Sequence, residues 1–203
     1  MKILAIGAHP DDVEMGCGGT IAKSTSNGKK VGIIDLTRGE LGTNGTVEIR
    51  EEEANVASRI LGVSFRINLE LEDGFIFNNK ESQIKIVEVI RHYKPDIVLS
   101  NTQIDRHSDH GKASDLIYDA CFISGLSKLK TSFENHKIQM DQPPICVTND
   151  FKTANGGTRL EVLPQLGVQC YAVWVVEFES EMDQIDFENK VNDPERGLYA
   201  RSN

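Results

Sequence analysis

Residues 5–19 read AIGAHPDDVEMGCGG. The first of these residues end a short apolar run at residues 2–8. This run is bounded by turn formers, as expected of a buried β-strand. The sequence HPDD (residues 9–12) follows this run directly. Two adjacent carboxylates repel each other and favour a solvated turn, so they are an unusual end for a core strand. Either HPDD is an ordinary acidic turn, or a cation belongs beside it.

Strand-like and helix-like patterns alternate over the first 126 residues of the chain. Apolar runs predict strands at residues 2–8, 31–37, 64–69 and 96–101. Helical spacing predicts helices from about Gly18 to Asn27, from a Thr46 cap to Leu61, at residues 81–94 and at residues 114–126. This alternation is typical of the α/β class, here a Rossmann-like, mostly parallel sheet flanked by helices.

The pattern becomes irregular after about residue 130, where turn formers dominate and residues 169–179 give the clearest strand signal. We therefore expect one domain over residues 1–203. Its Rossmann-like core is expected at residues 1–130, followed by a divergent C-terminal segment at 131–203.

Charge and cysteine usage exclude several classes of partner and location. The formal net charge is −9, which disfavours nucleic acid or an anionic membrane as the main partner. No apolar run approaches the roughly 20 residues that span a bilayer, and the start lacks the features of a secretory signal. The four cysteines are widely spaced without a CxxC pair, so we expect neither a disulfide framework nor a thiolate metal site, and a cytoplasmic location.

A second histidine–aspartate cluster, DRHSDH (residues 105–110), follows the fourth predicted strand. In an open doubly wound sheet the fourth strand commonly lies beside the first. Ligands then bind in the crevice beyond the carboxyl ends of these strands. The predicted topology therefore brings HPDD and DRHSDH to one place.

The residue types in these clusters favour a metal site. Three nitrogen and oxygen ligands with an open position are the form of a catalytic zinc site, and imidazole and carboxylate suit zinc. Pro10 fixes the backbone, so His9 and Asp12 can turn toward one point and leave Asp11 beside the metal as a base. Alone, each motif also reads as an acidic turn or a solvated loop. Iron(II) or cobalt(II) are alternatives to zinc.

With AHPDDVE and RHSDH both in view, the chain resembles the PIG-L/LmbE superfamily of zinc-dependent N-acetylglucosaminyl deacetylases. The segments GCGGTIAK, DLTRGELGTNGT, EIREEEA and DRHSDHGKAS make it most similar to the bacillithiol biosynthesis deacetylases, which act on N-acetylglucosaminyl malate. The resemblance covers roughly residues 2–130, and the sequence departs from these relatives beyond residue 140.

The resemblance implies a role for each residue of the two motifs. One zinc ion per chain is implied, with two histidines and one carboxylate as its ligands: His9, Asp12 and His110. Asp11 is the implied general base. His107 is implied to stabilise the tetrahedral intermediate, with Asp109 orienting its ring.

Two residues outside the clusters are candidates for supporting roles. Arg50 matches a substrate-contacting arginine of the family, and its guanidinium suits a bidentate grip on a carboxylate such as that of malate. From the residues alone, Arg50 reads equally well as a helix-surface arginine paired with nearby glutamates. Glu14 either bonds to a neighbouring loop and supports the site, or is an exposed acid.

The predicted function is zinc-dependent hydrolytic deacetylation of a small-molecule N-acetylglucosaminyl conjugate, with N-acetylglucosaminyl malate as the first choice. One alternative is a deacetylase for another N-acetylated amino sugar. Another is a metal- or sugar-binding homologue that the divergent C-terminal segment leaves without activity. A nucleotide-binding Rossmann module is disfavoured, because HPDD places carboxylates where phosphates need bare backbone amides. The oligomeric state stays open, a homo-oligomer included.

Overall fold

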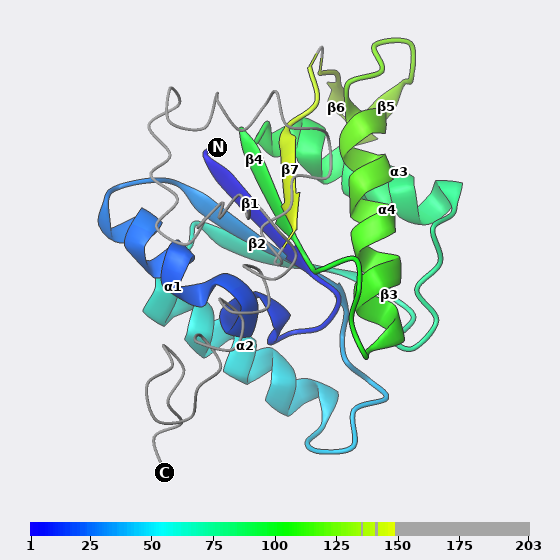
Figure 1. The fold of residues 1–203 in the computed structure, drawn as a ribbon. Coiled ribbons are helices and arrows are strands. Elements are labelled where there is room, and N and C mark those ends of the chain that lie inside the picture. Colours follow the sequence, from blue (N-terminus) through cyan, green and yellow to red (C-terminus); the bar gives the residue numbers. More distant parts are fainter. Residues whose placement is uncertain (135, 141, 149–203) are drawn as a thin grey trace, which may run out of the picture. The chain divides into compact units, whose positions relative to one another are not determined.

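A five-stranded parallel sheet forms the centre of the protein in the computed structural model, which describes residues 1–134, 136–140 and 142–148 (Figure 1). The strand order is β3-β2-β1-β4-β7, with every neighbouring pair parallel. The strands are β1 (Ile3–Gly7), β2 (Val31–Thr37), β3 (Phe65–Leu71), β4 (Ile97–Ser100) and β7 (Ile145–Thr148). The predicted Rossmann-like α/β class is confirmed.

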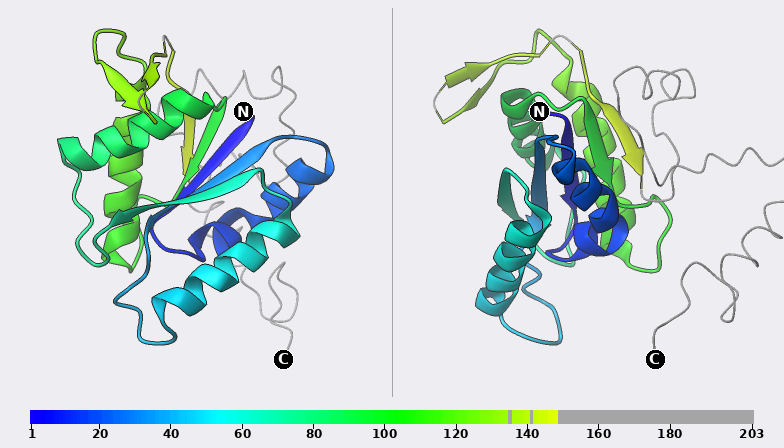
Figure 2. Two further views of the ribbon diagram at one scale, coloured as in Figure 1. Left: turned by 180° about the vertical axis from the view of Figure 1, so that it is seen from behind. Right: turned by 90° about the vertical axis from the view of Figure 1, so that its left-hand side faces the viewer.

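Helices cover both faces of the sheet (Figure 2). The strands read as continuous apolar runs because alternate side chains point to opposite faces and both faces are buried. In β1, Leu4 and Ile6 pack in the cluster that includes α3 (Lys80–Tyr93) and α4 (Ser108–Ser124). Ile3 and Ala5 pack in a second cluster with α1 (Asp12–Ser26), while α2 (Val47–Leu61) lies next to α1.

Most of the expected elements appear within two residues of their predicted ends. The cap of α2 is confirmed, because Oγ1 of Thr46 accepts a hydrogen bond from the amide of Ile49 at 3.3 Å. The predicted pairing of the first and fourth strands is also confirmed, with Leu4 opposite Val98. This pairing places the carboxyl ends of β1 and β4 side by side.

Two helices begin earlier than predicted. α1 starts at Asp12 instead of Gly18, and its backbone is non-helical at Cys17, so its first turn is separated from the rest by a kink. α4 starts at Ser108 instead of Ser114. Both first turns carry charged residues close to glycines, and this made them read as loops. As a result His110 lies on the first turn of a helix.

The expected irregularity is wrong for the described part of the C-terminal segment. β5 (Thr131–Phe133) and β6 (His136–Ile138) pair as an antiparallel hairpin, and the β7 residues Ile145 and Val147 are buried at the sheet edge beside β4. The strand predicted at residues 169–179 lies outside the described residues. Among the helices that the structure describes, none has the length and apolar character needed to cross a membrane.

Candidate active site

The two histidine–aspartate clusters meet at the carboxyl ends of β1 and β4, as the strand order predicts. HPDD forms the connection from β1 into α1, and DRHSDH leads from β4 into α4. Both clusters line one open cleft of about 620 Å³. The cleft lies where parallel sheets of this order bind ligands, so we expect it to be the active site.

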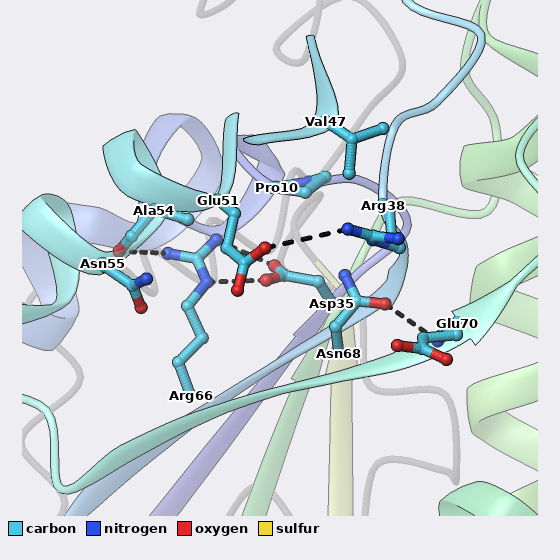
Figure 3. Close-up of a pocket in the computed structure, with 10 residues that line it drawn as sticks. All are labelled: Pro10, Asp35, Arg38, Val47, Glu51, Ala54, Asn55, Arg66, Asn68 and Glu70. Carbon is cyan, nitrogen blue, oxygen red and sulfur yellow. Dashed lines mark hydrogen bonds and ion pairs between the residues drawn. The ribbon is translucent and has the colours of Figure 1, made fainter. Parts of the chain in front are cut away.

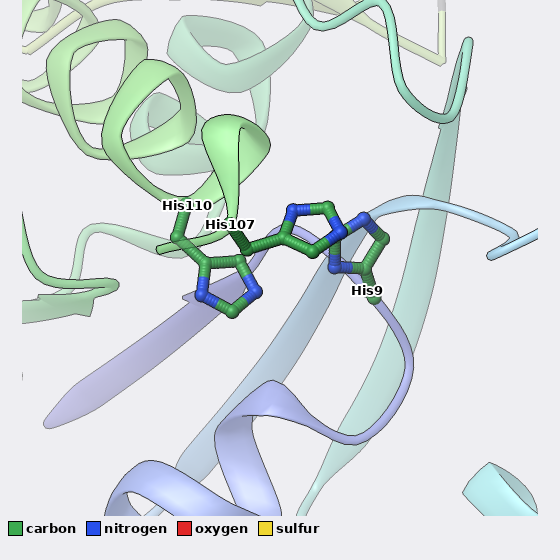
Figure 4. A group of neighbouring side chains, drawn as sticks. All are labelled: His9, His107 and His110. Atoms are coloured by element: carbon green, nitrogen blue, oxygen red, sulfur yellow. The ribbon is translucent and has the colours of Figure 1, made fainter. Parts of the chain in front are cut away.

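Three imidazoles gather at this point (Figure 4). His9, His107 and His110 each offer a ring nitrogen, and these atoms lie within 4.8 Å of one another. The His107 and His110 rings stack with their centroids 4.9 Å apart, and the His9 ring meets His107 edge-on at 4.8 Å. Histidines at this spacing suit the binding of a single cation.

The carboxylate of Asp12 lies between two of these rings. Its Oδ1 is 3.1 Å from Nε2 of His110, and its Oδ2 is 3.5 Å from Nδ1 of His9. Asn101 Nδ2 donates to the same Oδ2 at 3.1 Å, while its Oδ1 accepts the amide of Ala8 at 3.0 Å. Asp12 therefore contacts both of the other predicted ligands, His9 and His110, and Asn101 fixes the orientation of its carboxylate.

His110 is also held from its other side. Its Nδ1 lies 3.0 Å from Oδ2 of Asp105, and Oδ1 of Asp105 accepts the amide of His107 at 2.9 Å. These two bonds keep the pKa of Asp105 below its usual range. A carboxylate on the second nitrogen of a ligand histidine fixes the ring and raises its basicity.

His9 is surrounded by carboxylates. Its Nε2 lies 3.0 Å from Oδ1 of Asp73 and 3.6 Å from Oδ2 of Asp109. Burial opposes a charge on His9, but the bond to Asp12 and the charges of these three acids raise the pKa of His9 to about 9. The cluster therefore attracts a positive charge at neutral pH.

This donor set fits a divalent cation. Asp109 is fully buried and its Oδ1 has no hydrogen-bond partner among the described residues. Nζ of Lys112 lies 3.7 Å from Oδ1 of Asp109, beyond hydrogen-bond distance. A buried, partly unsatisfied carboxylate beside histidines and further carboxylates is costly unless positive charge balances it. Oxygen and nitrogen donors of this kind suit zinc and its neighbours in the first transition series.

The expectation that Asp109 orients His107 through its carboxylate needs correction. Oδ2 of Asp109 accepts the amide of Gly74 at 2.7 Å and faces His9. The ring of His107 is instead held by the backbone, because its Nδ1 accepts the amide of Asp109 at 3.3 Å. The early start of α4 explains the difference, since His107 is its N-cap and Asp109 lies inside its first turn, pointing into the core. The bond to Nδ1 places the proton of the neutral ring on Nε2.

Asp11 has the freedom that a proton acceptor needs. It occupies the N-cap position of α1, yet its side chain makes no capping bond. The residue is exposed and lines the cleft beside His9 and Asp12. In the part of the chain that the structure describes, no hydrogen bond or ion pair engages its carboxylate.

Arg50 lines the same cleft from the first turn of α2. Its guanidinium lies over the glycine-rich loop, where a Cβ added to Gly42 would come within 2.5 Å of Nη2 and one on Gly39 within 3.2 Å of Nη1. No described residue forms a hydrogen bond or ion pair with the Arg50 side chain. The reading in which neighbouring glutamates pair with Arg50 is therefore wrong, and its donors remain available to a ligand.

Comparison with known proteins gives the family. The sequence pattern of the PIG-L family, described as GlcNAc-PI de-N-acetylase, matches residues 4–121, more than half of the chain. The chain belongs to the PIG-L family. The match spans both clusters and Arg50.

Several known proteins resemble this PIG-L chain. The uncharacterised deacetylase YaiS of Escherichia coli is 37% identical over 114 residues, which cover 53% of the chain and 61% of YaiS. The diacetylchitobiose deacetylase of Thermococcus kodakarensis is 36% identical over 153 residues, covering 68% of the chain and 57% of that enzyme. The chain thus spans less than two thirds of either relative. The crystal structure of the conserved protein TT1542 of Thermus thermophilus superposes with a TM-score of 0.65 at 38% identity, covering 76% of the chain and 69% of TT1542.

The PIG-L site contains supporting residues to which the sequence assigned no such role. Asn101 sits at the end of β4, and Asp105 precedes His110 by five positions. Asp73 reaches His9 from the segment after β3, and its Oδ2 accepts the amide of Leu41 at 2.9 Å. The one available signal was position, because Asn101 and Asp105 follow directly on a strand that ends at the predicted crevice.

Proposed function

We propose that this chain is a metal-dependent hydrolase that removes the acetyl group from an N-acetylated amino-sugar conjugate. The observation that carries the proposal is the contact of Asp12 with both His9 and His110, in a cleft that also holds Asp11, whose carboxylate no described residue engages. Membership of the PIG-L family and similarity to proteins named deacetylases support it.

His9, Asp12 and His110 would hold the metal, with zinc as the expected ion and iron(II) or cobalt(II) as alternatives. When bound, the ion supplies Lewis-acid polarisation of the acetyl carbonyl and lowers the pKa of the attacking water. Asp105 and Asp73 keep the two histidine rings oriented for this task.

Asp11 is suited to accept the proton of the attacking water, because its carboxylate is exposed in the cleft and is bonded to none of the described residues. As charge develops on the carbonyl oxygen, Nε2–H of His107 is the available donor, since its Nδ1 is occupied by the backbone. The departing amine then takes a proton from Asp11, which has just gained one, or from His107.

Arg50 gives the proposal its finer substrate assignment. The Arg50 guanidinium lines the cleft and has no partner among the described residues, so it suits a ligand carboxylate, and bidentate geometry adds specificity. We therefore propose N-acetylglucosaminyl malate, the bacillithiol precursor, as substrate. We propose that the deacetylation takes place in the cytoplasm. A second candidate is a neutral acetylated amino sugar, which the similarity to a diacetylchitobiose deacetylase favours.

The test is amine release by the zinc-loaded protein from N-acetylglucosaminyl malate, N-acetylglucosamine and diacetylchitobiose. We expect amine release from at least one of these substrates, with the highest kcat/KM on N-acetylglucosaminyl malate. Preference for diacetylchitobiose would support the second candidate. Stoichiometric zinc without amine release from any of them would overturn the enzymatic proposal and leave a metal-binding homologue.

A further inference from the structure

A buried charge cluster lies beneath the candidate site, outside the residues that the cleft exposes. It consists of Glu14 on α1, Asp35 on β2 and Arg66 on β3, and we call it the Arg66 clamp. The side chains are 24%, 4% and 6% exposed, respectively. Figure 3 shows Arg66 between Asp35 and Ala54 at the edge of a second, smaller cavity of about 270 Å³.

The guanidinium of Arg66 is engaged on all sides. Its Nε and Nη2 donate to the two carboxylate oxygens of Asp35 at 2.6 and 2.8 Å, a bidentate fork. Its Nη1 donates to Oε1 of Glu14 and, at 3.2 Å, to the carbonyl of Ala54 on α2. Because the donors form a rigid planar fork, these three partners are held at fixed positions relative to one another.

The partners lie next to the functional residues. Glu14 follows Asp12 by two positions, and Asp35 is paired in the sheet with Gly7, just before HPDD. The kink at Cys17 separates the first turn of α1 from the rest of the helix, and Asp11 provides no side-chain cap. The bond from Arg66 to Glu14 therefore ties this turn to β3 independently of the rest of its own helix.

The same guanidinium also reaches α2. Ala54 lies four positions after Arg50, one turn further along that helix. One side chain is thus bonded to the turn that carries Asp12 and to the helix that carries Arg50.

We propose that Arg66 is a positioning residue that sets the metal-binding turn and the substrate arginine at a fixed spacing, with Glu14 and Asp35 holding it in register. The inference rests on the proposed function for the roles of Asp12 and Arg50. Arg66 itself touches neither the metal ligands nor the substrate. Substituting a residue of the Arg66 clamp is therefore expected to change the zinc affinity of the site and to change kcat and KM together.

The test compares Glu14→Gln and Arg66→Lys with a matched control. Glu14→Gln keeps the shape but removes the charge, and Arg66→Lys keeps the charge but removes the planar fork. Glu52→Gln is the control, since Glu52 pairs with Arg59 on the exposed face of α2, with side chains 70% and 66% exposed. Zinc affinity is measured on the full chain by competition with a chromophoric chelator, alongside melting temperature and amine release.

We expect Glu14→Gln and Arg66→Lys to weaken zinc binding about 10-fold, to lower kcat and to raise KM for the malate conjugate, while Glu52→Gln behaves as wild type. Variants with a lower melting temperature but wild-type zinc affinity, kcat and KM would overturn the proposal, because the clamp would then act on stability alone. Wild-type protein that binds zinc but releases no amine would overturn the proposed function, while the zinc affinities would still decide the role of the clamp.

Discussion

Oδ1 of Asp12 lies 3.1 Å from Nε2 of His110, although one residue follows β1 and the other lies in the first turn of α4, after β4. The contact exists because β4 pairs directly with β1, which aligns the carboxyl ends of the two strands. Asp12 is engaged by His9 at the same time, so its pKa is held below its usual range even though burial opposes this. The carboxylate is therefore ionised and placed to share a cation with both rings.

Removing His110 is expected to abolish metal binding. His110→Ala deletes one of three proposed ligands, so we expect loss of stoichiometric zinc and of amine release, and loss of the rise in melting temperature on adding zinc. The measurement is metal content together with thermal unfolding with and without zinc. His136→Ala is the control, because His136 is exposed on β6. Wild-type zinc content in the His110 variant would contradict its assignment as a ligand.

Asp11 is expected to affect turnover rather than metal binding. Asp11→Asn removes the proton acceptor but leaves His9, Asp12 and His110 in place, so we expect kcat to fall by about 10²- to 10⁴-fold with zinc content unchanged. Asp115→Asn, on an exposed position of α4, should behave as wild type. Turnover within a few-fold of wild type in the Asp11 variant would reject this residue as the base.

Arg50 is expected to decide between charged and neutral substrates. Arg50→Ala should lower kcat/KM on N-acetylglucosaminyl malate by roughly 10- to 100-fold, the value of a charge-assisted bond, and leave N-acetylglucosamine nearly unaffected. Arg59→Ala on the exposed face of α2 is the control. An equal loss of kcat/KM on both substrates would show that Arg50 maintains the structure of the cleft and does not bind the malate carboxylate.

Gly42→Ala offers a second approach to the same residue. A Cβ at Gly42 would lie 2.5 Å from Nη2 of Arg50, so the guanidinium must move while its charge stays. We expect a partial loss of kcat/KM confined to the malate conjugate, smaller than that of Arg50→Ala. The measurement is kcat/KM of Gly42→Ala and Arg50→Ala on N-acetylglucosaminyl malate and on N-acetylglucosamine.

The stability of the metal-free protein should depend on the protonation of His9. The pKa of His9 is raised from 6.5 to about 9 in the folded state, so protonated His9 stabilises the fold. This contribution is complete below pH 6.5 and is lost as the pH rises through 9. Unfolding of the chelator-treated protein over this range should show the decline, and His9→Gln should flatten it. Stability that rises between these pH values in the wild type, or an unchanged slope in His9→Gln, would contradict the prediction.

Sequence patterns predicted the sheet because its central strands are buried on both faces. β1 and β2 are continuous apolar runs in the sequence. Thr46 was predictable as a helix cap, because a threonine hydroxyl can accept a backbone amide hydrogen at the start of a helix. The meeting of HPDD with DRHSDH followed from strand order alone. The early starts of α1 and α4 were missed, because their first turns carry the charged residues of the two motifs and too few apolar residues to show a helical period.

The supporting residues could not be predicted for a different reason. Asp73 and Arg66 act through contacts with segments distant in sequence, Asp73 with His9 and Arg66 with Glu14. No local pattern marks such partners, since an isolated aspartate or arginine in a sequence reads equally well as a surface charge. Glu14 was left open between a bond to a loop and exposure, and the structure shows it bonded to Arg66 on β3 instead.

The most direct test of the account is amine release from N-acetylglucosaminyl malate by chelator-treated wild-type protein as zinc is added back. We predict no release without metal and a rise that levels off at about one zinc ion per chain, in parallel with binding measured on the same samples. Full release from the metal-free protein, or zinc binding at this stoichiometry with no release at any ratio, would contradict the assignment of His9, Asp12 and His110 as a catalytic metal centre.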